Sequence, residues 1–173
     1  MRQEGSLVAP DRLRFDFRHY GPLSNKEVDR IEGLVNDTLW ANLPVLVEEM
    51  RLENALAKGA LAFFGDKYGD DVRVVSVPDF SIELCGGTHT KATGEIGLFK
   101  IAHETGIAAG IRRIEALTGP GAFQHLKQEE EVLHESADRL KTKPLDVPEK
   151  VDRLFDSTRA LEREVQQLRA RLG

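Results

Sequence analysis

Cysteine is scarce in this chain, since Cys85 is the only one among 173 residues. A single cysteine cannot close a disulfide within the chain. No apolar run approaches the roughly 20 residues of a membrane-spanning helix, and the first residues lack the basic and apolar parts of a signal peptide. These absences favour a soluble, cytoplasmic protein without a membrane partner.

An excess of positive charge is also lacking. The formal net charge of −5 gives no general attraction to nucleic acid, so any contact with RNA would depend on local basic clusters. Arg112 and Arg113 form one such cluster, and three arginines alternate with other residues over positions 12–18. The alternation over 12–18 is more typical of the solvated face of a strand than of an RNA site.

The hydrophobic pattern predicts an α+β fold over residues 1–119, with a largely antiparallel sheet and helices packed on one side. Ser24 and Glu27 have the spacing of a capping box and begin a predicted helix that ends near residue 41. A second helix is predicted over 52–65. Strands are predicted over 13–17, 43–50, 72–77, 80–84, 96–102 and 107–117, with a turn at 103–106 between the last two.

Residues 120–173 have a different composition and form a second predicted region, a helical linker. Glycine is absent between Gly121 and Gly173, and the pattern predicts one helix over 122–141 and another after Pro148. The last helix carries a heptad seam, which needs a partner helix. The preceding helix, folded back as a hairpin, is the favoured partner, and a second copy of the chain in a coiled coil is the alternative. The seam consists of Val151, Leu154, Thr158, Leu161, Val165, Leu168 and Leu172.

Cys85 and His89 stand four residues apart across two glycines. Thiolate and imidazole suit zinc, and a hydrolytic zinc site holds three protein ligands and a water. Two ligands make only half of such a site, and the same spacing also fits a buried free cysteine with an unrelated histidine nearby.

Six motifs follow one another in the order and spacing of a known family, at residues 5–8, 13–17, 59–68, 84–89, 93–97 and 110–116. Together they resemble the editing domain of bacterial alanyl-tRNA synthetase over residues 3–119. The helical segment after them resembles the linker that follows this domain. Related proteins are the free-standing alanyl-tRNA editing proteins and the second additional domain of threonyl-tRNA synthetase.

The resemblance implies a hydrolase that removes serine or glycine attached by mistake to the acceptor end of alanine tRNA. An alanine pocket cannot reject the smaller glycine by its shape, so a second site must cleave the wrong ester. By resemblance, Cys85 and His89 are a zinc ligand pair and Gln3 contributes to substrate discrimination. Thr88 either hydrogen-bonds the substrate or closes the glycine turn.

The two adjacent arginines are the candidate RNA contacts. Arg112 and Arg113 are expected on opposite faces of one strand, so that one can meet phosphate while the other pairs with a carboxylate.

The sequence departs from the family in the first zinc ligand pair, an H-x-x-x-H that lies upstream of Gln3 in the family. None of the remaining histidines forms such a pair; they are His19, His103, His125 and His134. The chain is therefore expected to be a piece truncated at its N-terminal side, with half a zinc site, poor zinc affinity and no hydrolysis when alone. His103, in the predicted turn, is expected to be a surface residue.

The same residues also fit a second function, a non-catalytic module that binds tRNA or joins partners through the heptad helix. A purely structural zinc domain is disfavoured, because it would need a second ligand pair.

Overall fold

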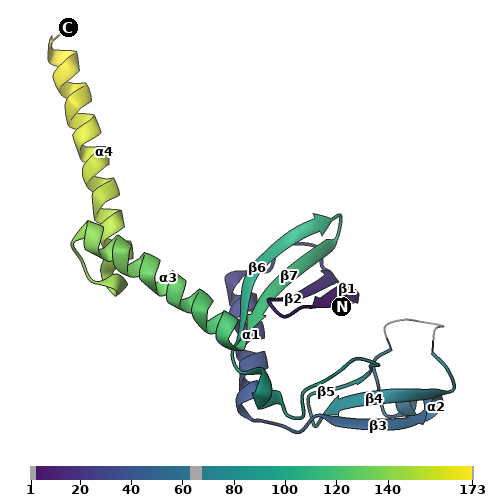
Figure 1. Ribbon diagram of the computed structural model, residues 1–173. Coiled ribbons are helices and arrows are strands. Elements are labelled where there is room, and N and C mark those ends of the chain that lie inside the picture. Colours follow the sequence, from purple (N-terminus) through teal and green to yellow (C-terminus); the bar gives the residue numbers. More distant parts are fainter. Residues whose placement is uncertain (1–2, 63–67, 173) are drawn as a thin grey trace. The chain divides into compact units, whose positions relative to one another are not determined.

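The computed structural model describes residues 3–62 and 68–172, and the chain divides into two units, Met1–Gln124 and His125–Gly173. Figure 1 shows the elements in order along the chain. None of the described helices combines the length and apolarity that crossing a bilayer requires.

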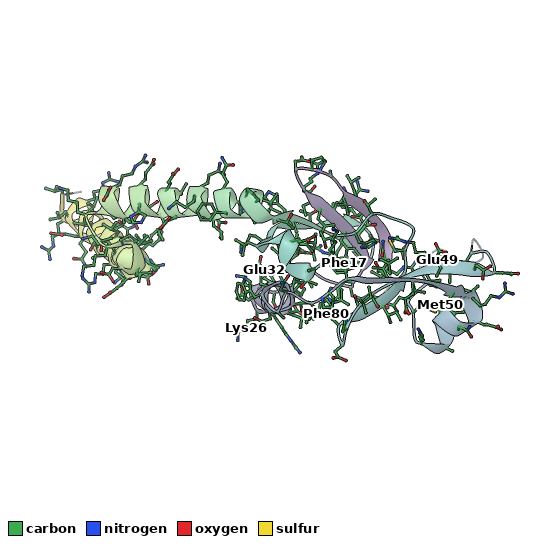
Figure 2. All side chains as sticks on the ribbon, turned by 60° about the horizontal axis from the view of Figure 1, so that its bottom comes forward. Phe17, Lys26, Glu32, Glu49, Met50 and Phe80 are labelled. Carbon is green, nitrogen blue, oxygen red and sulfur yellow. The ribbon has the colours of Figure 1, made fainter. Side chains whose placement is uncertain are left out.

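The first unit contains a four-stranded antiparallel sheet in the order β1-β2-β7-β6. Its strands are β1 (Gln3–Val8), β2 (Leu13–Arg18), β6 (Phe99–Ala108) and β7 (Ile111–Thr118). Helix α1 (Asn25–Trp40) begins at Ser24, whose side chain forms the predicted capping box with Glu27. Apolar side chains of α1 and of the sheet form one core around Phe17, labelled in Figure 2; its buried members are Phe17, Leu39, Phe99, Ile101, Ile114 and Ala116.

A second, three-stranded antiparallel sheet has the order β3-β4-β5. It contains β3 (Leu46–Arg51), β4 (Asp71–Val77) and β5 (Ser81–Leu84), and the short helix α2 (Leu52–Ala57) follows β3. This sheet has a core of its own, formed by Ala55, Ala60, Val72, Val74 and Leu84. The α+β class and the antiparallel pairing are thus confirmed, while the expected single sheet is divided into two.

The chain returns from the second sheet to α1 through the short 3-10 helix η2 (Thr93–Ile96). The buried Thr93 hydroxyl donates to the Thr38 carbonyl at 2.7 Å and accepts from the Leu43 amide at 2.9 Å. The Asn36 side chain bonds both the amide and the carbonyl of Phe99, each at 2.9 Å. These buried bonds fix the segment that follows Cys85 and His89 against α1.

Two element predictions are wrong. The helix predicted over 52–65 ends at Ala57, because Gly59 takes a positive φ of 84° and Leu61 leaves the helix to bridge Glu83. Residues 63–65 of that prediction lie outside the described residues.

The turn predicted at 103–106 is part of strand β6. His103 therefore pairs with Glu115 in a strand, although it is exposed as expected, and the real turn lies at Gly110, which has a φ of 69°. Gly106 serves a different purpose, since a Cβ there would lie 2.7 Å from Nη1 of Arg112. It leaves room for a guanidinium and does not turn the chain.

Helix α3 (Gly119–Leu140), the 3-10 turn η3 (Pro144–Asp146) and helix α4 (Val147–Leu172) complete the chain. α4 has no buried residue among those described, and Leu154, Leu161, Val165 and Leu168 of the seam are 45–61% exposed. The favoured hairpin, in which α3 covers this seam, is therefore not formed.

Candidate functional site

The candidate site lies in the loop that follows β5. Leu84, the last residue of β5, is buried in the core of the second sheet and anchors the start of the loop. Arg73 of β4 then holds the loop backbone: its carbonyl accepts from the Cys85 amide at 3.1 Å, and its Nη1 donates to the carbonyls of Cys85 at 2.8 Å and Gly87 at 2.5 Å. The position of the thiol is thus set by backbone hydrogen bonds to a neighbouring strand.

The two glycines bring Cys85 and His89 together, as the spacing predicts. Nε2 of His89 lies 3.1 Å from Sγ of Cys85. A Cβ at Gly87 would lie 3.5 Å from this sulfur and 4.0 Å from this nitrogen, so the backbone of Gly87 lies close to both atoms. Cys85 is half-buried and His89 is exposed, so the pair remains accessible from solvent.

A third potential ligand, Glu83, was not among the residues singled out from the sequence. One oxygen of its carboxylate, Sγ of Cys85 and a ring nitrogen of His89 all lie within 4.8 Å of one another. The sequence carried a signal for it, because Glu83 and Cys85 are two positions apart at the end of a strand and alternate residues share a face.

An apolar cavity of about 730 Å³ lies beside this loop, and Thr88 and His89 contribute to its wall. Most of the wall is formed by side chains of the four-stranded sheet and α1, among them Leu13, Phe15, Phe17, Ile31, Val35 and Leu39. Polar loop residues at the edge of an apolar cavity are the arrangement of a small-molecule site, in which few polar groups orient a ligand.

Comparison with known proteins identifies the chain's relatives. Residues 72–115 match the family model described as the threonyl and alanyl tRNA synthetase second additional domain. Over all 173 residues the chain is 52% identical to the alanine–tRNA ligase of Geobacillus kaustophilus, and it covers 20% of that protein. It is 50% identical over 169 residues to the alanine–tRNA ligase of Methylococcus capsulatus, again over 20% of the relative.

The chain is homologous to one segment of the alanine–tRNA ligases. It spans about one fifth of the length of the curated relatives that it matches. The part that matches the family model begins in β4 and ends in β7, so it includes Glu83, Cys85 and His89 as well as both candidate arginines.

Arg112 and Arg113, the two arginines for which the sequence predicts a contact with RNA, each form an ion pair in the structure. Arg113 donates two hydrogen bonds to Asp16, at 2.7 and 2.9 Å, and Arg112 donates two to Glu104, at 2.5 and 2.6 Å. The register places Arg112 opposite Phe17 and Arg113 opposite Asp16, so the two side chains point to opposite faces as expected. Both are paired with carboxylates, where the sequence led us to expect one.

These ion pairs shift the acidity of their carboxylates. Hydrogen bonds from Arg113 hold the pKa of Asp16 below its usual value, against the opposing effect of burial. Hydrogen bonds from Arg112 lower the pKa of Glu104 in the same way. Each arginine uses Nε and Nη2 in its pair, so Nη1 takes no part in either of these ion pairs.

Gln3 lies in β1, where its side-chain amide donates to Oγ of Ser6 at 3.0 Å. It is not among the described residues that line the apolar cavity. The structure therefore brings together Thr88, Cys85 and His89 of the candidate residues and places Gln3 in a separate local interaction.

Proposed function

We propose that this chain is most of an editing domain, in which Cys85 and His89 contribute to a zinc site for hydrolysis of serine or glycine from mischarged alanine tRNA in the cytoplasm. The observation that carries the proposal is the 3.1 Å approach of Sγ and Nε2 at the edge of the apolar cavity that His89 lines. The homology to alanine–tRNA ligases supports a tRNA as the partner.

The donor set fits zinc. Tetrahedral zinc with bonds of about 2.3 Å to sulfur and about 2.0 Å to nitrogen separates the two ligand atoms by about 3.5 Å. The observed 3.1 Å needs only a small outward movement of the exposed imidazole. When bound there, zinc would supply an electrophile that polarises the ester and lowers the pKa of a water.

The surrounding residues have separate tasks in this proposal. Thr88, on the same loop as the ligand pair, offers a hydroxyl to the aminoacyl group at the cavity wall. The apolar wall excludes bulk water from the bound aminoacyl group. Gln3 takes part in discriminating the substrate, and Nη1 of Arg112 or Arg113 contacts the phosphates of the acceptor end.

Deacylation of alanine tRNA that has been mischarged with serine tests this function. The chain should be compared with a version joined at its N-terminus to the preceding segment of the Geobacillus kaustophilus relative. We expect the joined version to deacylate and the 173-residue chain, which has no H-x-x-x-H, to be slower by about 100-fold or more. Cys85→Ala should remove the activity of the joined version, whereas His103→Ala, an exposed histidine outside the cavity lining, should not.

Two outcomes of this assay would contradict the proposed function. One is an inactive joined version that is folded and loaded with zinc. The other is activity that Cys85→Ala leaves unchanged, because that result would separate hydrolysis from the loop after β5.

The exposed seam of α4 favours one additional role, pairing with a second copy of the chain. Four of its apolar side chains are 45–61% exposed, and their heptad spacing is that of a coiled-coil partner surface. The molecular mass in solution is the measurement that decides it.

A further inference from the structure

We infer that Arg73 is a positioning residue of the candidate site, whose guanidinium holds the loop after β5 in the shape that hydrolysis requires. The inference rests on the proposed function in taking this loop as the place of hydrolysis. Nη1 of Arg73 donates to the carbonyl of Cys85 at 2.8 Å and to the carbonyl of Gly87 at 2.5 Å. In the described part of the chain, no other side chain forms a hydrogen bond with the backbone of residues 85–89.

The loop has little else to hold its shape. Residues 86–90 are exposed, lie in no helix or strand, and form no backbone–backbone hydrogen bond among the described residues. A Cβ at Gly86 would meet no atom within 4 Å, so neither packing nor steric contact restrains that residue. The path of the chain across its two glycines therefore depends on the bonds from Arg73.

Arg73 reaches the loop from a well-fixed part of the second sheet. It lies in β4, the central strand, and its backbone pairs with Glu49 of β3, which Figure 2 labels. Its neighbours Val72 and Val74 are buried in the core of this sheet, so strand alternation directs the Arg73 side chain to the other face. The Arg73 carbonyl also accepts from the Cys85 amide, which ties the start of the loop to the same residue.

The guanidinium of Arg73 is not committed to an ion pair. No carboxylate of the described residues pairs with it, whereas Arg112 and Arg113 each have a carboxylate partner. Both N–H groups of Nη1 can point to the two loop carbonyls at once, one to each, because the guanidinium is a planar fork. A lysine ammonium lacks this fork, so a lysine at this position can replace only part of the function.

This arrangement bears on the rate of hydrolysis and not on the binding of RNA. Arg73 is not among the described residues that line the apolar cavity, so it acts through the loop and does not touch the bound aminoacyl group. The loop carries Cys85, Thr88 and His89. A misplacement of about 1 Å at a reacting group can lower the rate by about 100-fold. Loss of Arg73 should therefore lower kcat and leave KM nearly unchanged.

Backbone NMR order parameters of the 173-residue chain, measured without added metal, test whether Arg73 orders the loop. We expect those of Gly86 and Gly87 to fall from about 0.8 in the wild type to below about 0.6 in Arg73→Ala, with intermediate values in Arg73→Lys. The matched control is Arg51→Ala, which removes a 54% exposed arginine at the end of β3 in the same sheet. It should leave both glycines as ordered as in the wild type.

Steady-state deacylation by the joined version tests the consequence for the reaction. We expect Arg73→Ala to lower kcat by about 100-fold, with KM for the mischarged tRNA within about twofold of the wild-type value. Arg73→Lys should lower kcat by about tenfold, and Arg51→Ala should leave both constants unchanged. Urea unfolding of each variant reports whether the sheet remains folded, and Arg73→Lys is the deciding variant if Arg73→Ala does not fold.

The inference is overturned if the deciding variant, once shown to be folded, keeps the wild-type order parameters at both glycines. It is also overturned if kcat is unchanged, and a rise in KM alone would assign Arg73 to RNA binding instead. An inactive joined version of the wild type would contradict the proposed function. The order parameters of the 173-residue chain would still decide whether Arg73 holds the loop.

Discussion

The two units of the chain are stabilised by different kinds of contact. In residues 1–124, several ion pairs join positions that are far apart in the sequence, such as Asp16 with Arg113 and Glu32 with Lys100, beside a few local ones such as Asp11 with Arg12. In residues 125–173, the ion pairs of the described helices join residues three or four positions apart, such as Glu149 with Arg153. The first unit has two buried cores, whereas α4 has no buried residue in the part described.

The folded structure of the first unit and that of α4 therefore depend on different interactions. Buried apolar surface and long-range ion pairs make the first unit cooperative, because each contact depends on several distant elements. Local pairs stabilise a helix by only about 0.2–0.5 kcal/mol each, so α4 depends mainly on its own helix propensity. The candidate site belongs to the first unit, which can hold ligand atoms in place.

Phe17→Ala should have the largest effect on the first unit. Phe17 is 1% exposed, and truncating a buried phenylalanine costs about 3–5 kcal/mol of unfolding free energy through lost burial and the cavity that remains. Urea unfolding, followed by fluorescence of Trp40 in α1, measures it. The matched control is Phe155→Ala in α4, where the side chain is 61% exposed and the expected cost is below about 1 kcal/mol. Equal costs would show that the two units do not differ in this way.

Asp16→Asn should have an intermediate effect. It leaves the Arg113 guanidinium, 29% exposed, without its carboxylate, and the expected loss is about 1–3 kcal/mol. The matched control is Asp11→Asn, whose side chain is 70% exposed in its pair with Arg12 and whose loss should stay below about 0.5 kcal/mol.

The same pair predicts how stability depends on pH. Because folding lowers the pKa of Asp16 below 3.8, its contribution is complete above that value and is lost as the pH falls through the lower pKa of the folded state. Glu104 contributes with the same sign. Unfolding free energies from pH 6 to about 2.5 should therefore fall less steeply in Asp16→Asn than in the wild type. Parallel pH profiles for the two proteins would contradict this assignment.

Local patterns allowed most elements to be predicted from the sequence. The capping box at Ser24 and Glu27 and the strand at residues 13–17 depend on neighbours within a few positions, and both are confirmed. The division into two sheets depends on long-range pairing, such as that of β2 with β7, which no local window contains. Gly106 was interpreted as a turn residue because its actual role, space for Arg112, depends on a neighbouring strand.

The candidate site shows the same limit. Cys85 and His89 could be paired from their spacing, since two glycines permit a tight loop. The strand end at Leu84 was predicted, but the approach of the Glu83 side chain to Cys85 and His89 depends on three-dimensional placement that the predicted strand does not give. The carboxylate partner of Arg113 lies 97 positions away, which sequence spacing alone could not reveal.

Leu161→Glu in α4 should have the smallest effect on stability and a clear effect on association. Leu161 is 61% exposed, so the substitution should change the unfolding free energy of the first unit by less than about 0.5 kcal/mol. If the seam pairs with a second copy, a charge at its centre should convert a dimer at tens of micromolar into a monomer, as measured by sedimentation equilibrium. Ala160→Glu adds the same charge one position away from the seam and should leave the dimer intact. A monomeric wild type at these concentrations would exclude self-pairing, and α4 would then differ from the first unit in having an apolar surface that this chain does not itself cover.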